Sequence, residues 1–183
     1  MCEGLVSNYG SIETARLSIV NFSEQHITDR YLDWLNDQEV LRFSDQRHSR
    51  HDFSSSKQYL LSFRDTPNEL LAIMAKDSEL GYIGTMSVYV EELHGIADLG
   101  IMIGERKAWG LSYGAEAWSD VCDLLFTNTN IRKITAGTIE TNIAMIKLMK
   151  KVGMVEDGRR KAQCLWEGKA VDVIHAALYR EEY

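Results

Sequence analysis

The chain has 183 residues, of which 45% are hydrophobic and 26% are charged, and its formal net charge at pH 7 is −7. This is the composition of an ordinary globular protein, and the length suits one domain. An acidic chain with scattered Lys and Arg lacks the basic face that nucleic acids and anionic membranes require, so we expect neither as a partner.

The sequence carries no recognisable membrane or export signal. No apolar run approaches the ~20 residues that span a bilayer, and residues 1–10 lack the basic and apolar regions of a signal peptide. We expect residues 1–10 to form a flexible tail and residues 11–183 to form a single domain. The three cysteines are widely spaced and match no metal motif or disulfide framework, which favours a cytoplasmic protein without a metal site.

The first elements alternate between extended and helical patterns. Alternating apolar residues predict a strand over 16–22. Apolar residues at helical spacing predict a helix over 25–36, with Ser23 as its cap, and a second short helix over 38–43. A polar loop then follows over 44–51.

A third helix and a group of strands complete the first half. Ser54 or Ser55 is the expected cap of a helix that runs through Phe63. Apolar and β-branched runs separated by turn residues then predict a meander of strands over 70–76, 82–90 and 97–103.

The second half returns to helical spacing and ends in a hairpin. Helices are predicted over 113–127 and 142–152, with a strand over 131–139 between them, and Gly153 fits the left-handed cap of the second helix. Two last strands are predicted over 155–167 and 170–180, joined by a Glu-Gly turn. Antiparallel strands followed by a βαβ crossover predict an α/β fold with a mixed, mostly antiparallel sheet flanked by helices.

The segment between the third meander strand and the next helix suits an anion. Gly110, Ser112, Gly114 and Ala115 allow a ligand to approach the backbone closely. The first N–H groups of a helix have no internal partner, and the helix dipole is positive there, so this terminus suits a diphosphate. A tight turn without a ligand explains the glycines equally well. The segment lacks the Gly-Lys-Ser/Thr end of a phosphate loop and follows a meander, unlike a dinucleotide fingerprint.

Two motifs in this region resemble one family. The run Trp109-Gly-Leu-Ser-Tyr-Gly-Ala-Glu-Ala117 resembles the acyl-coenzyme A diphosphate loop of GNAT N-acetyltransferases, in particular the RimJ/RimL-like branch. Ser112 stands where that branch usually has glycine, so we expect a slightly altered loop geometry. The run from Asn142 to Met154 resembles the second family signature, Asn-x-x-Ser/Ala-x-x-x-(Tyr)-x-Lys-x-Gly-Phe.

This resemblance implies direct acetyl transfer from acetyl-CoA, as co-substrate, to a primary amine. It implies that the strand before the loop separates from its neighbour in the sheet, and that the cofactor binds where the two strands part. The implied cofactor contacts are the backbone N–H groups of that strand, the loop itself and the second motif helix. The candidate residues are Ile101, Met102, Ile103, Trp109, Gly110, Leu111, Ser112, Tyr113, Gly114, Ala115, Asn142 and Met145. Asn142 is equally well explained as the N-cap of its own helix.

Two carboxylates are candidates for the general base that the amine needs. Asp98 stands where the RimL-like branch often has an acidic residue, and Glu140 follows the strand over 131–139. Asp98 is also explained as an ordinary exposed carboxylate on an antiparallel strand. The tyrosine that many family members use as a general acid is replaced by Met149, which we expect in the core.

The acceptor is expected beside the polar loop, because this region flanks the cleft in the family. Arg42, Arg47, His48, Arg50 and His51 make the loop locally basic, which suits a small amine acceptor that carries phosphate, such as a nucleotide-linked amino sugar. The run from Trp34 to Phe43 also resembles family members in surface-polysaccharide amino-sugar pathways. A solvated loop with scattered charges is the alternative, and the two histidines lack the further ligands that a metal site needs.

Two other functions compete with a small-molecule acetyltransferase. One is a protein N-terminal acetyltransferase of the RimL type, and the other is an acyl-CoA-binding module without turnover. The sequence does not fix the oligomeric state and leaves a homodimer open.

Overall fold

The computed structural model describes residues 10–180, so the expected tail over residues 1–10 lies almost entirely outside the described residues. Strands and helices alternate in a mixed α/β order. The strands are β1 Ile12–Glu13, β2 Leu17–Asn21, β3 Glu69–Ala75, β4 Tyr82–Glu91, β5 Ile96–Ile103, β6 Lys133–Ile139, β7 Val155–Trp166 and β8 Lys169–Tyr179. The α-helices are α2 Asp29–Asn36, α3 Phe53–Leu61, α4 Tyr113–Asn128 and α5 Ile143–Lys151.

The strands form one eight-stranded sheet in the order β1-β2-β3-β4-β5-β6-β8-β7. Every neighbouring pair is antiparallel except β5 and β6, which are parallel. The helix α4 connects these two strands, because parallel neighbours need a crossover connection. The predicted mixed, mostly antiparallel sheet flanked by helices is therefore confirmed.

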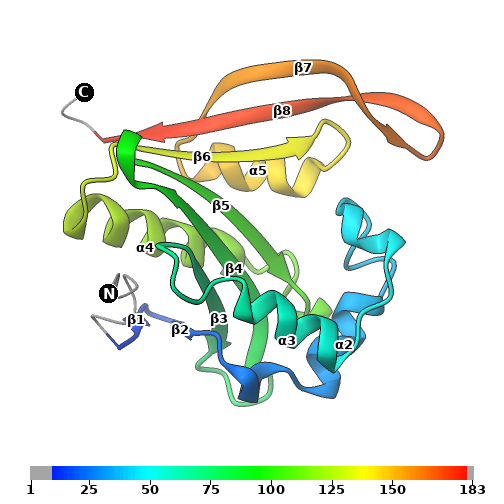
Figure 1. The fold of residues 1–183 in the computed structure, drawn as a ribbon, viewed down its shortest axis with the longest axis vertical. Coiled ribbons are helices and arrows are strands. Elements are labelled where there is room, and N and C mark those ends of the chain that lie inside the picture. Colours follow the sequence, from blue (N-terminus) through cyan, green and yellow to red (C-terminus); the bar gives the residue numbers. More distant parts are fainter. Residues whose placement is uncertain (1–9, 181–183) are drawn as a thin grey trace.

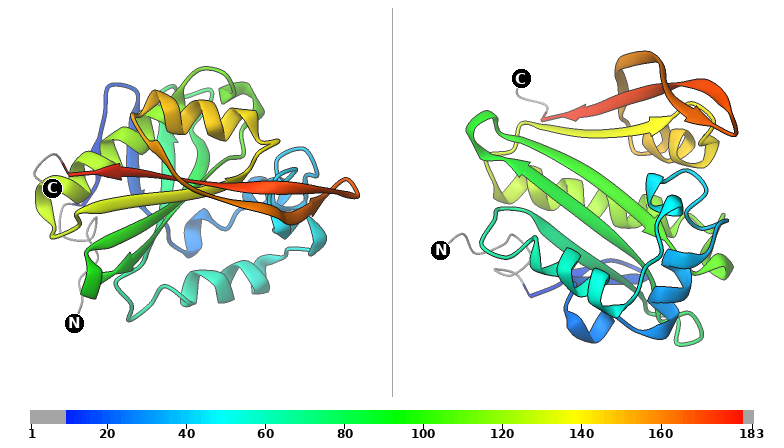
Figure 2. Two further views of the ribbon diagram at one scale, coloured as in Figure 1. Left: turned by 90° about the horizontal axis from the view of Figure 1, so that it is seen from above. Right: turned by 45° about the vertical axis from the view of Figure 1, so that its right-hand side comes forward.

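Helices cover both faces of the sheet (Figures 1 and 2). The helices α4 and α5 pack on one face, over a core that includes Trp118, Val121 and Met149. A second core on the other face joins α2 to β3 and β4 through Tyr31, Trp34 and other aromatic side chains. No described helix has the length and apolar character needed to cross a membrane.

Local sequence signals set several boundaries as predicted. The Asn142 side chain accepts the N–H of Met145 at the start of α5, and Gly153 after this helix has a φ of +83°. Glu167 and Gly168 have φ values of 49° and 75°, so the β7–β8 hairpin turns through two left-handed residues.

The predictions for residues 25–43 were partly wrong. The expected helix over 25–36 is a 3₁₀ turn followed by the shorter α2, which Thr28 caps instead of Ser23. The expected helix over 38–43 is a series of turns. The carboxylate of Asp37 accepts the N–H groups of Glu39 and Val40, a local bonding pattern that competes with a helix. The helix α3 is capped by Asp52 and not by Ser54 or Ser55.

Candidate active site

The strands β5 and β6 are paired at one end and separate toward the other (Figure 1). Their parallel pairing covers Ile96 to Asp98 on β5 and ends at Thr135 on β6. From Leu99 onward β5 is paired only with β4, so its other edge is open. An open strand edge offers backbone N–H and C=O groups to an extended ligand.

The backbone of β5 alternates between its two neighbours. Gly104 N–H donates to the Ile83 carbonyl of β4 at 2.9 Å, and bonding residues alternate along an antiparallel pair. The backbone groups of Met102 are therefore directed toward β4, and those of Ile101 and Ile103 toward the gap. The expectation that Met102 offers a free N–H at this edge is wrong. Its side chain packs instead against the core beneath α2.

The turn that leads from β5 into α4 has left-handed backbone at two residues. Gly110 has a φ of 75° and Ser112 a φ of 66°. Ser112 thus adopts a conformation that glycine would favour, and this accounts for glycine at that position in the resembling loops. The indole N–H of Trp109 donates to the Ile103 carbonyl at 2.7 Å and ties the turn to the end of β5.

Unpaired amides lie at the start of α4. In the described part of the chain, the N–H groups of Tyr113, Gly114 and Ala115 have no hydrogen-bond acceptor, and Glu116 is the first residue whose N–H reaches back, to the Ser112 carbonyl. These free donors, together with the positive end of the helix dipole, form a cradle that suits a diphosphate.

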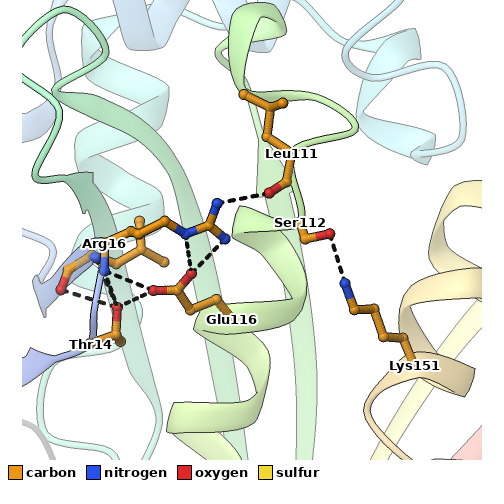
Figure 3. A network of polar contacts seen from close by, with 7 residues as sticks. Thr14, Arg16, Leu111, Ser112, Glu116 and Lys151 are labelled. Carbon is orange, nitrogen blue, oxygen red and sulfur yellow. Dashed lines mark hydrogen bonds and ion pairs between the residues drawn. The ribbon is translucent and has the colours of Figure 1, made fainter.

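Lys151 on α5 approaches this cradle from across the gap. Its ammonium donates to the Ser112 hydroxyl at 2.7 Å (Figure 3). Lys151 is not among the residues predicted from the sequence, although it occupies the Lys position of the second motif. Lys147, one helical turn earlier, lines the same cleft, so the four-residue spacing of the two cations was the available signal.

One cleft of about 1330 Å³ joins the open edge of β5 to the starts of α4 and α5. All the cofactor candidates except Leu111 line it: Ile101, Met102, Ile103, Trp109, Gly110, Ser112, Tyr113, Gly114, Ala115, Asn142 and Met145. The Leu111 carbonyl instead accepts a hydrogen bond from Arg16. The side-chain amide of Asn142 is occupied as well, because it caps α5 and donates to Thr138.

Asp98 lies where the strands β5 and β6 part. The Thr135 hydroxyl donates to its carboxylate at 2.6 Å. The carboxylate keeps an exposed side, yet desolvation by its neighbours raises the pKa of Asp98 above the ordinary value. The hydrogen bond from Thr135 and the nearby His175 offset only part of this rise. Asp98 itself does not line the cleft, but Leu99 and Gly100, the next residues, do.

Glu140 lies outside the cleft lining. Its carboxylate accepts the Asp172 N–H at 3.0 Å and lies 3.4 Å from the Arg159 guanidinium. These contacts tie the end of β6 to the β7–β8 hairpin. Met149, at the position of the family's tyrosine, is only 2% exposed and belongs to the core, as expected.

The basic loop contributes unequally to the cleft. His51 lines it, together with Arg50, whereas Arg47 lines a smaller neighbouring cavity of about 300 Å³. Arg42 and His48 line neither of these cavities. Within residues 10–180, no group of three or more His, Cys, Asp and Glu side chains is arranged to hold a metal ion.

The tip of the β7–β8 hairpin contacts the segment before the basic loop. The rings of Phe43 and Trp166 stack with centroids 5.8 Å apart, and the Arg42 guanidinium lies 5.4 Å from the Trp166 ring. The Trp166 indole N–H also donates to the Arg42 carbonyl at 3.4 Å. Phe43 lines both cavities, so this contact joins the hairpin to the region expected to take the acceptor.

Residues 16–155 match the family model of the acetyltransferase (GNAT) domain. The chain belongs to the GNAT acetyltransferase family. The match spans β2 to the start of β7 and includes the open edge of β5, the turn before α4 and the cap of α5. The protein is therefore an acyltransferase of the N-acetyltransferase type, which uses acetyl-CoA as donor.

Solved structures share the acetyltransferase fold at low sequence identity. The chain is similar to RimL, a ribosomal L7/L12 alpha-N-protein acetyltransferase solved with coenzyme A, with a TM-score of 0.80 and 15% identity over 94% of this chain and 99% of that one. It is similar to spermidine N-acetyltransferase from Vibrio cholerae, solved with CoA and spermine, with a TM-score of 0.80 and 16% identity over 93% and 99%.

A third similar structure is the microcin C7 self-immunity acetyltransferase MccE, solved with acetyl-CoA and AMP. Its TM-score is 0.78, with 12% identity over 91% of this chain and 94% of that one. RimL and the spermidine enzyme act on different acceptors and have the same TM-score, so the fold alone does not name the acceptor of this acetyltransferase.

Proposed function

We propose that this acetyltransferase acetylates the primary amine of a small, hydroxyl-rich acceptor that carries phosphate, such as a nucleotide-linked amino sugar. One observation carries the proposal: the same cleft that takes in the start of α4 continues to Arg50 and His51, through a wall of neutral hydroxyl and amide side chains. A donor at one end and an acceptor at the other would meet beside β5.

The donor half suits acetyl-CoA. The free amides at 113–115 and the ammonium of Lys151 favour a diphosphate, since both supply positive charge and hydrogen bonds. The open backbone edge at Ile101 and Ile103 fits the amide-bearing arm that ends in the thioester. An N–H group at this edge would stabilise the negative charge that develops on the carbonyl oxygen of the thioester.

The acceptor half is polar and carries little negative charge. Its hydrogen-bonding side chains are Ser44, Gln46, Ser49, Ser55, Ser56, Tyr59, Thr85, Ser87 and Tyr89. Glu39 is the one carboxylate among the described residues that line the cleft, and it lies 3.7 Å from the guanidinium of Arg42. A polyamine would leave most of its charges without a partner here, whereas hydroxyl groups and a phosphate find complementary partners.

Asp98 is the proposed general base, acting through water. Its position beside Leu99 places it at the closed end of the gap, and its raised pKa makes the carboxylate a better proton acceptor than an ordinary aspartate. Glu140 has no such placement, because it is bound to Arg159 and Asp172. The coenzyme A thiolate, with an ordinary thiol pKa of about 8.5, leaves without a tyrosine acid.

A protein N-terminal acetyltransferase is the second candidate. The similarity to RimL favours it, but the spermidine enzyme has the same TM-score. MccE, solved with AMP, is in turn consistent with a nucleotide-bearing acceptor. Since the chain belongs to an acetyltransferase family, a binding module without turnover is the weaker interpretation.

The test is a thiol-release assay with acetyl-CoA and matched acceptors: a free amino sugar, its nucleotide-linked form, spermidine and an N-terminal peptide. We expect the nucleotide-linked sugar to have the highest kcat/KM. We expect Arg50→Ala to reduce its preference over the free sugar about tenfold, as loss of a charge-assisted contact would. Highest turnover on the peptide would instead establish the second candidate.

A further inference from the structure

The turn before α4 is held by residues that do not line the cleft. Ser112 has left-handed backbone, which a residue with a side chain rarely adopts unless its surroundings impose it. The free amides at 113–115 follow directly, so their direction depends on this turn. Whatever fixes the turn therefore also fixes the donors of the diphosphate cradle.

Arg16, at the start of β2, contacts the turn and the helix at once (Figure 3). One nitrogen of its guanidinium donates to the Leu111 carbonyl at 3.0 Å, and another donates to the Glu116 carboxylate at 2.7 Å. The same guanidinium lies 4.3 Å from the centre of the Tyr113 ring. A planar, forked side chain thus bridges the turn and the first turns of α4.

Glu116 is anchored from the same strand region. Its carboxylate accepts the Thr14 hydroxyl at 2.5 Å and the Arg16 backbone N–H at 3.0 Å. Desolvation alone would raise the pKa of Glu116, but the bonds from Thr14 and Arg16 outweigh it, so the pKa lies below its ordinary value. The group is therefore an ionised carboxylate with a side chain only 17% exposed.

An ionised carboxylate beside a diphosphate cradle repels its ligand unless a cation neutralises it. Arg16 supplies that cation on the side of the turn away from the cleft, and Lys151 holds the Ser112 hydroxyl from the opposite side (Figure 3). Arg16, Thr14 and Glu116 are all absent from the cleft lining, so we expect them to act on a donor in the cleft only through the turn and the helix.

We infer that Arg16 and Glu116 are positioning residues for the donor's diphosphate: together they fix the turn over 110–112 and keep the neighbouring negative charge neutralised. The inference rests on coenzyme A as the donor and does not depend on the proposed acceptor.

The experiment measures coenzyme A binding by calorimetry in Arg16→Ala and in a matched control, Lys57→Ala. Lys57 also forms an ion pair, at 2.9 Å from Glu24, and does not line the cleft. We expect the dissociation constant to rise about tenfold in Arg16→Ala and to stay within about twofold in the control. Arg16→Lys keeps the charge but cannot reach Glu116 and Leu111 together, so we expect an intermediate value.

A second readout separates positioning from a damaged fold. S-acetylpantetheine carries the thioester arm but no diphosphate, so Arg16→Ala should retain the wild-type dissociation constant for it while losing affinity for coenzyme A. Unchanged coenzyme A binding in Arg16→Ala overturns the inference, and so does an equal loss for both compounds. Because no acceptor is needed, failure here is distinct from failure of the proposed acceptor assignment.

Discussion

The hydroxyl of Thr135 on β6 donates to the carboxylate of Asp98 on β5 at 2.6 Å, at the last paired position of the two strands. The bond connects β5 and β6, the only parallel pair of the described sheet. Its acceptor is the carboxylate that we propose as the general base.

Thr135→Val should shift the pH dependence of the reaction. The Thr135 hydroxyl stabilises the ionised form of Asp98, so its removal should raise a pKa that desolvation already raises. A base must be ionised, so the acid limb of the kcat/KM profile should move to higher pH. The measurement is kcat/KM for the acceptor between about pH 5 and 9.

Asp98→Asn is the matched variant for this shift. It removes the titrating group, so its profile should lose the acid limb, and turnover at neutral pH should fall by at least about tenfold. If Asp98→Asn keeps the wild-type profile and most of its turnover, Asp98 is not the base.

Lys151→Met should weaken coenzyme A binding, whereas Lys150→Met should not. The two lysines are adjacent, but only Lys151 lines the cleft and contacts Ser112. Loss of one partly exposed cation beside a diphosphate should cost about 0.7–1.4 kcal/mol, or about three- to tenfold in affinity. The difference should shrink at high salt. Equal affinities of the two variants for coenzyme A at low salt would show that Lys151 does not contribute to diphosphate binding.

Trp166→Ala should raise the KM for the acceptor and leave coenzyme A binding unchanged. The Trp166 ring stacks on Phe43 and contacts Arg42, so its loss should loosen the hairpin over the acceptor side. A stacked aromatic pair contributes about 0.5–1.5 kcal/mol, which corresponds to about two- to tenfold in KM. Leu93→Ala is the control, since Leu93 is 88% exposed in the β4–β5 connection. A parallel loss of coenzyme A affinity would contradict a contact that serves only the acceptor.

The elements that local patterns encode were predictable. The helix predicted over 113–127 is Tyr113–Asn128, because Trp118, Val121 and Leu125 recur at helical spacing and are buried together. The Glu-Gly turn after β7 was also predictable, because a two-residue hairpin turn of this kind requires left-handed backbone.

The features that long-range contacts create were not predictable. Asp37, the C-cap of α2, also forms an ion pair with Arg106, a residue 69 positions away in the sequence. The contact between Arg16 and Glu116 spans 100 positions of sequence, and neither residue belongs to a local pattern that indicates the other. The sequence therefore indicated the loop that holds the diphosphate, but not the residues that hold the loop.

Gly104→Ala should destabilise the protein at the end of β5. A Cβ built at Gly104 would lie 2.0 Å from the ring of Trp34, a buried side chain of α2 that cannot move freely. Overpacking of this kind costs about 1–3 kcal/mol, so we expect a lower midpoint in urea with an unchanged slope. Gly158→Ala is the control, because its Cβ would have no neighbour within 4 Å and its φ is outside the left-handed region. It should stay within about 0.5 kcal/mol of the wild type. Equal stability of the two variants would show that Trp34 of α2 does not pack closely against the end of the strand that carries the open edge.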